Sequence, residues 1–97
     1  TGIDIGLRYG TAIAAADGGQ VIFAGWWGGY GQATIIDHGN GFSTVYGHQS
    51  RIYVKKGQAV RKGQTIGAVG STGYSTGPHL HFEIRQRGAT VNPLRFL

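Results

Sequence analysis

The sequence predicts an all-β domain built mostly from antiparallel strands. Glycine makes up 19 of the 97 residues without any repeating period, and no segment carries apolar residues at the 3.6-residue spacing of an amphipathic helix. Short apolar runs instead alternate with turn residues, which is typical of strands joined by tight connections. We therefore expect one compact sandwich or barrel-sandwich hybrid over residues 1–97, with glycine-rich loops around a groove.

Each expected strand is a short apolar or alternating run that ends at a turn signal. The Asp17-Gly18-Gly19 and Gly39-Asn40-Gly41 segments are hairpin signals between such runs. Gly57 and Gly63 mark further turns, and the sequence GSTGYSTGP at 70–78 reads as a loop. Besides a first strand around residue 4, the expected strands cover 12–16, 20–24, 33–38, 42–47, 52–54, 65–69 and 80–85, with a short tail at 90–91.

Composition excludes several classes of function. Without cysteine, the chain has no disulfide, no cysteine-based zinc site and no thiol nucleophile. No apolar run approaches the length of a membrane span. The formal net charge of +5 suits a polyanionic partner such as an acidic cell-wall polymer. Nucleic acid is not expected as a partner, because the basic residues are scattered and no recognition helix or RNP motif is present.

The sequence GPHLHFEI at 77–84 carries the first candidate site. In a strand, His79, His81 and Glu83 share one face, and the apolar residues between and after them cover the other. The two imidazoles could bind a metal ion or act in catalysis. They could equally be ordinary polar residues on the wet face of a half-buried strand.

Two more polar residues make a functional site the better interpretation. Asp4 lies between two isoleucines in TGIDIG, so its carboxylate points away from an apolar face. In STVYGHQS, the same alternation predicts that Tyr46 and His48 share a face. An aspartate, a histidine and an H-x-H pair together supply the oxygen and nitrogen donors, and the spare imidazoles, of a mononuclear zinc hydrolase.

The chain resembles the catalytic domain of the lysostaphin-type (LytM-like) zinc metallopeptidases over essentially its whole length. The resemblance rests on TGIDIG, ADGGQVIFAGW, IDHGNGFSTVYGHQS and the specific GPHLHFE block. It implies that Asp4 and His81 are zinc ligands and that His48 and His79 are the catalytic pair. It also implies a third ligand, a histidine, at the position immediately before Thr1.

By this resemblance, the protein is a monomeric zinc-dependent endopeptidase that hydrolyses peptide cross-links or stem peptides of bacterial peptidoglycan. Its expected location is the periplasm, the cell envelope or the extracellular space. One alternative is a catalytically silent LytM-like module that binds cell wall or activates an amidase. The segment VKKGQAVRKGQTIGAVGSTG also resembles the hammerhead of biotinyl and lipoyl carrier domains, but it lacks the exposed attachment lysine.

Four other residues and two loops have expected roles of their own. His38, at the start of a turn, matches no site position and is expected to be structural. Glu83 could orient a ligand imidazole or be an outer polar residue, and Tyr46 could hydrogen-bond substrate. Gly2 could adopt a positive φ and bend the segment that precedes Asp4. The loops at 26–31 and 70–77 are expected to wall a narrow groove for small-residue peptides.

Overall fold

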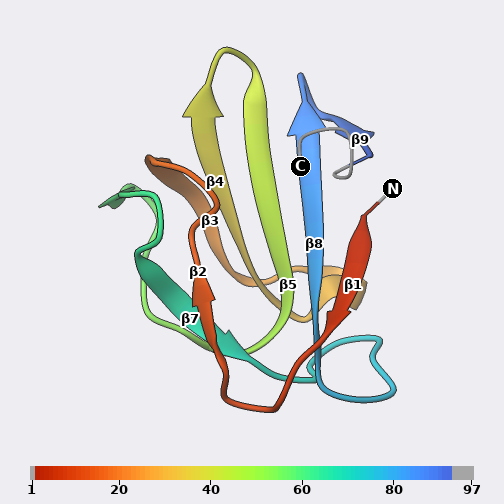
Figure 1. The fold of residues 1–97 in the computed structure, drawn as a ribbon. Helices are drawn as coiled ribbons and strands as arrows, with labels where there is room; N and C mark the ends of the chain where they lie inside the picture. Colours follow the sequence, from red (N-terminus) through yellow and green to blue (C-terminus); the bar gives the residue numbers. More distant parts are fainter. Residues whose placement is uncertain (1, 93–97) are drawn as a thin grey trace.

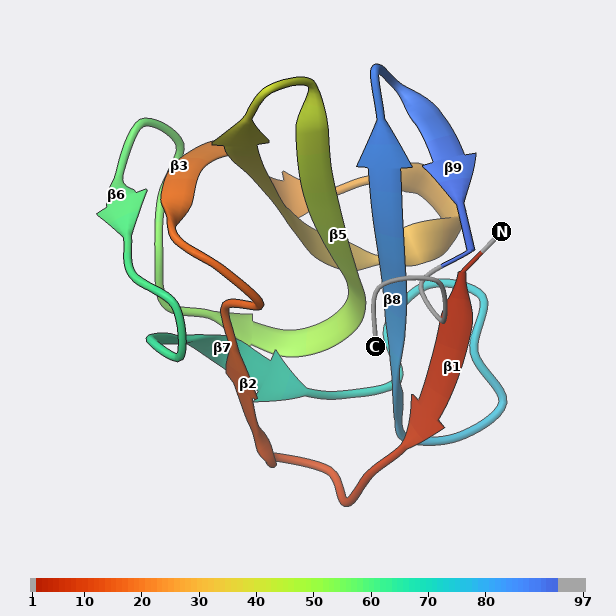
Figure 2. The ribbon, with the colours of Figure 1, turned by 45° about the horizontal axis from the view of Figure 1, so that its top comes forward.

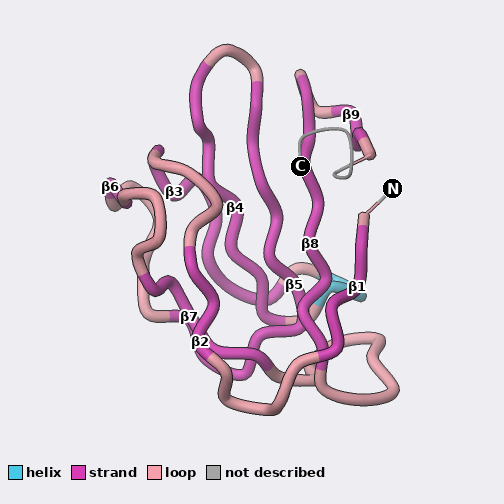
Figure 3. The backbone as a smooth tube through the Cα atoms, viewed as in Figure 1, coloured by secondary structure: helices cyan, strands magenta, loops and turns pink. Residues whose placement is uncertain are grey.

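A computed structural model describes residues 2–92 and confirms the all-β prediction (Figure 1). The described strands form one antiparallel sheet with the central order β1-β8-β5-β4-β3-β6; β7 joins through β5 and β2, and β9 pairs with β8. The strand bounds are β1 Ile3–Gly6, β2 Ala12–Ala14, β3 Gly19–Trp26, β4 Gln32–Gly39, β5 Phe42–Ile52, β6 Ala59–Val60, β7 Thr65–Val69, β8 His79–Gln86 and β9 Ala89–Val91. Between β3 and β4 lies a single 3-10 turn, η1 (Gly28–Tyr30), which Figure 3 distinguishes from the strands and loops.

The long strand β5 organises the sheet because it pairs with three neighbours. β4 flanks one side of it, while on the other side β8 pairs from Phe42 to Gly47 and β7 from Gln49 to Ile52. Figure 2 shows β5 curving from the β4–β8 layer toward β7. The change of partner falls at His48, which has a φ of 61°. Beyond this residue, β5 is paired with β7 and no longer with β8.

The structure corrects the predicted strands at two places. The expected separate strand at 52–54 does not form, because Ile52 is the last residue of β5 and the chain leaves the ladder after it. The two-residue strand β6, which pairs with the start of β3, was not predicted. A run of two residues gives too short a pattern for alternation to reveal.

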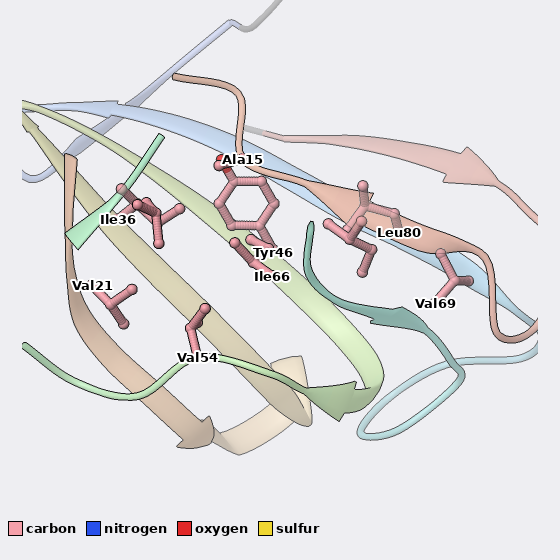
Figure 4. Packing of buried hydrophobic residues seen from close by; sticks show 10 residues of the cluster. Ala15, Val21, Ile36, Tyr46, Val54, Ile66, Val69 and Leu80 are labelled. Atoms are coloured by element: carbon pink, nitrogen blue, oxygen red, sulfur yellow. The ribbon is translucent and has the colours of Figure 1, made fainter. Parts of the chain in front are cut away.

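The apolar core lies inside the curved sheet, where Tyr46 is the largest fully buried side chain (Figure 4). Its hydroxyl accepts a hydrogen bond from the Ala16 amide at 2.9 Å and shares a second bond with the Thr44 hydroxyl at 2.7 Å. Burial raises the pKa of this phenol above its ordinary value. The expected role of Tyr46 in binding substrate is therefore wrong, as is its predicted placement on the same face as His48.

The positive φ of His48 is the reason for that error. Alternation holds only while consecutive residues keep the extended conformation, and His48 leaves it.

Across residues 2–92, no helix is long and apolar enough to cross a membrane.

Candidate functional site

The polar face of β8 lies against the first strand of the chain. Alternation along β8 is as predicted: Leu80 is in the core and Phe82 packs against it, while the histidines face the other way. In the antiparallel register of β1 and β8, Asp4 is the partner of His81. The Asp4 Oδ1 atom lies 2.6 Å from His81 Nδ1 and 3.5 Å from His79 Nε2.

His48 joins this group from the point where β5 changes partners. Its ring centroid lies 4.6 Å from that of His79 and 6.0 Å from that of His81. Its Nδ1–H donates to the Thr72 carbonyl at 2.6 Å, which fixes the proton on Nδ1 because a carbonyl can only accept. The Nε2 atom of His48 is thereby left as a hydrogen-bond acceptor in the neutral ring.

The orientation of His79 is fixed in the same way. Its Nδ1–H donates to the Gly77 carbonyl at 2.9 Å, so Nε2 is again the accepting nitrogen and faces Asp4. In the neutral form, both imidazoles therefore present an accepting Nε2, and each ring is held through Nδ1 by a backbone carbonyl of the loop between β7 and β8. Two such nitrogens can accept a proton and return it later.

Glu83 is the buried end of the site. Its Oε2 accepts hydrogen bonds from His81 Nε2 at 2.8 Å and from the Tyr30 hydroxyl at 2.5 Å, and its Oε1 accepts from the Arg85 guanidinium at 2.9 Å. Burial by itself would raise the pKa of Glu83, but the hydrogen bonds from Tyr30, His81 and Arg85, with the charge of Arg85, hold it below its ordinary value. Of the two roles considered for Glu83, contact with His81 is the one observed.

Gly2 lies over this end of the site. Its expected positive φ depends on Thr1, which lies outside the described residues, and stays a prediction. A Cβ at this position would lie 2.7 Å from His81 Cε1 and 2.8 Å from Glu83 Cγ. Glycine is required because the backbone before Asp4 passes directly against the His81 ring.

Two loops wall an open groove of about 210 Å³ above the histidines, as the sequence predicted. Its lining residues are Gly29 and Tyr30 from one loop, Tyr74 from the other, and His48 and His81 between them. Tyr30 stacks on Trp27 at a centroid distance of 4.5 Å, and Tyr74 is 89% exposed at the rim. The groove leaves His48 and His81 open to the outside.

Two side chains at the site are of the types that bind zinc in proteins. Asp4 Oδ1 and His81 Nδ1 are close enough to share one ion. No group of three metal-binding side chains is found within residues 2–92. The described residues therefore fit a metal ion through two donors, one of which, His81, has an outer contact with Glu83.

His38 is structural, as expected. Its Nδ1 bonds the Gly18 carbonyl at 2.7 Å and its Nε2 bonds the Thr44 hydroxyl at 2.6 Å. Sequence reasoning missed Tyr30, Arg85 and Thr72. Arg85 follows Glu83 by two residues on the same strand face and could have been inferred from alternation, whereas Tyr30 and Thr72 reach the site only through folding.

The sheet, the groove and the cluster of three imidazoles with a carboxylate define a class of protein, the LytM-like peptidase domain. The sequence profile of peptidase family M23 matches residues 1–93, and the chain belongs to this family. It is 50% identical over 94 residues to the DD-carboxypeptidase/endopeptidase Mpg of Neisseria meningitidis, an alignment that covers 97% of this chain and 22% of that protein.

Two further similarities bear on function. The murein hydrolase activator EnvC of Escherichia coli is 43% identical over 96 residues, covering 99% of this chain and 23% of EnvC. The catalytic domain of lysostaphin from Staphylococcus simulans superimposes with a TM-score of 0.92 at 37% identity, covering 98% of this chain and 76% of that one. The chain thus spans about a quarter or less of the two curated relatives.

Proposed function

We propose that this domain is a zinc-dependent endopeptidase that hydrolyses peptide bonds of bacterial peptidoglycan in the cell envelope or outside the cell. Membership of family M23 and similarity to Mpg and lysostaphin support the proposal. The observation that carries it is the convergence of Asp4, His48, His79 and His81 from three strands, with His48 and His81 lining one groove.

In this proposal, Asp4 and His81 hold the zinc ion together with a histidine immediately before Thr1. When bound, zinc polarises the peptide carbonyl and makes water a better nucleophile. Asp4 supplies an anionic oxygen, and His81 supplies Nδ1 because its Nε2 is engaged by Glu83. Gly2 allows the chain to turn close over His81 between the first two ligands.

His48 and His79 move protons. Each presents an accepting Nε2, which can take a proton from the attacking water and deliver it to the leaving amine. The protonated rings would also stabilise negative charge that develops on the carbonyl oxygen. The two residues have the same hydrogen-bonding geometry, so the proposal assigns proton transfer to the pair.

A second candidate function is a catalytically silent module that activates another wall hydrolase. It is supported by the similarity to EnvC, whose name describes an activator. The two candidates differ in whether the domain binds zinc tightly.

Zinc titration and hydrolysis of purified cell walls test the proposal. Residues 1–97 should bind zinc weakly, and the same chain preceded by a histidine should bind it tightly at one ion per chain and release peptides. In that second chain, His48→Ala and His79→Ala should abolish hydrolysis and retain zinc, whereas His81→Ala should lose both.

His38→Ala is the matched control, because it removes a histidine that lies outside the cluster. Loss of zinc from the His48→Ala or His79→Ala variant would overturn the assignment of roles. Failure of the added histidine to improve zinc binding would overturn the metal site and favour the activator.

A further inference from the structure

Glu83, Tyr30, Arg85 and Trp27 form a connected set that reaches from the groove wall to His81. The Nε of Arg85 donates to Glu83 Oε1 at 2.9 Å, and its terminal Nη2 forms an ion pair with the same oxygen at 2.9 Å. Nη2 also donates to the Tyr30 hydroxyl at 3.2 Å. Its guanidinium carbon lies 5.3 Å from the centre of the Trp27 ring, on which Tyr30 is stacked. We call these four residues the Glu83 clamp.

The clamp leaves the Glu83 carboxylate almost no freedom. Its side chain is 5% exposed, so a lost hydrogen bond could not be replaced by bulk water. The hydrogen bond and ion pair with Arg85 occupy Oε1, and the Tyr30 hydroxyl and His81 Nε2 share Oε2. A charged acceptor held by several donors is the strongest kind of fixed partner for an imidazole N–H.

The two carboxylates that face His81 are unequal. Asp4, on the Nδ1 side, is 65% exposed and can exchange the imidazole for water. Glu83, on the Nε2 side, cannot. Both nitrogens of His81 lie within hydrogen-bond distance of a carboxylate, Nδ1 at 2.6 Å from Asp4 and Nε2 at 2.8 Å from Glu83. A neutral ring carries one proton and can keep only one of these bonds. The buried, fixed Glu83 favours the bond from Nε2, and the exposed Asp4 then turns to water.

We propose that the Glu83 clamp is a positioning device that fixes the proton of His81 on Nε2 and leaves Nδ1 ready to bind a cation. Tyr30 connects this choice of tautomer to the groove wall. The inference rests on the proposed metal role of His81. Neither Tyr30 nor Arg85 touches the metal or substrate carbonyl in this scheme; both act through Glu83. Tyr30 also lines the groove, so a peptide that displaces its ring would loosen the carboxylate behind it.

The first test measures the clamp without any metal. Nitrogen-15 chemical shifts of the histidine rings, recorded in zinc-free protein well above the ordinary histidine pKa of about 6.5, report which nitrogen carries the proton. We expect the Nε2–H form for His81 in the parent chain. In Glu83→Gln, the amide oxygen is drawn to Arg85 and the NH₂ group faces His81, so the Nδ1–H form should become the major one.

The second test is zinc titration of the same variants in the chain that is preceded by a histidine. Glu83→Gln should weaken zinc binding by about 10- to 100-fold, the usual effect of losing an outer partner of a ligand. Tyr30→Phe keeps the stack on Trp27 and removes only the hydroxyl, so it should show a smaller loss in the same direction. Asp37→Asn, which neutralises an exposed aspartate on β4, is the control and should leave both readouts unchanged.

The outcomes separate this inference from the proposed function. If His81 keeps its proton on Nε2 in Glu83→Gln, the clamp does not set the tautomer and the inference is wrong. If the tautomer changes but zinc binds neither the parent nor the variants of the chain preceded by a histidine, the clamp is real and the proposed metal role fails. Should Glu83→Gln not fold, Tyr30→Phe carries the test alone, and a zinc affinity equal to that of its parent overturns the inference.

Discussion

Gly73→Ala should destabilise the domain more than Gly63→Ala, a substitution at a glycine with a similar backbone conformation but with open space around it. Gly73 has a φ of 74°, and a Cβ there would lie 2.4 Å from the Gly31 nitrogen and 2.5 Å from the Gly29 carbonyl oxygen. Gly63 has a similar φ of 83°, yet a Cβ at that position would meet nothing within 4 Å. The pair therefore separates backbone strain from steric overlap.

The expected magnitudes follow from these two terms. A left-handed conformation costs an alanine about 1–2 kcal/mol relative to glycine, which is the whole effect expected for Gly63→Ala. Overpacking adds about 1–3 kcal/mol, and here the obstacle is backbone, which cannot rotate away. Gly73→Ala should therefore lower the free energy of unfolding by about 2–5 kcal/mol.

Urea unfolding of the two variants and the parent measures these losses. The change at Gly73 should also reach His48, because the carbonyl of the preceding residue, Thr72, holds the His48 ring. A shift of the His48 ring resonances is expected in Gly73→Ala alone. Equal losses of stability in the two variants would refute the claim that the loops at 28–31 and 71–74 are packed backbone against backbone.

Three other outcomes are expected. Because burial raises the pKa of Tyr46, the free energy of unfolding should fall more steeply above pH of about 10 in the parent than in Tyr46→Phe, and urea unfolding across that range measures the difference. His38→Gln should lower the free energy of unfolding by about 1 kcal/mol through lost hydrogen bonds, without changing hydrolysis in an active chain. Lys55 and Lys56 are exposed beside a groove and have no ion pair among the described residues, so they should contribute to binding of isolated cell walls. Lys55→Ser with Lys56→Ser should weaken that binding and reduce its dependence on salt, while cleavage of a short neutral peptide stays constant.

Alternation and turn chemistry predicted the parts of the fold that remain locally regular. The strand with His79 and His81 has the predicted faces, and its register with the first strand brings Asp4 to His81. Both depend only on extended residues whose apolar neighbours are buried. The loops expected to wall the groove do so because their glycines permit the close backbone contacts described above.

The contacts that sequence reasoning missed are those set by tertiary structure. Tyr30 meets Glu83 across 53 positions of sequence, and no local period indicates that distance. The placement of Tyr46 failed because a single residue, His48, reverses the alternation of a strand that otherwise obeys it. A long strand that changes partners cannot be told from two short strands by pattern alone, which also explains the wrong strand at 52–54.

The backbone at His48 distinguishes it from every other histidine of the described chain. Asn40 and Arg87, the other non-glycine residues with positive φ, lie in turns, where such conformations are common. His48 adopts its φ of 61° inside a strand, and a strained conformation of this kind persists only where the surroundings enforce it. The exchange of β8 for β7 as the partner of β5 enforces it, and the Thr72 carbonyl holds the ring that results. The same irregularity that defeats the strand pattern thus turns an imidazole out of the core and toward His79 and His81.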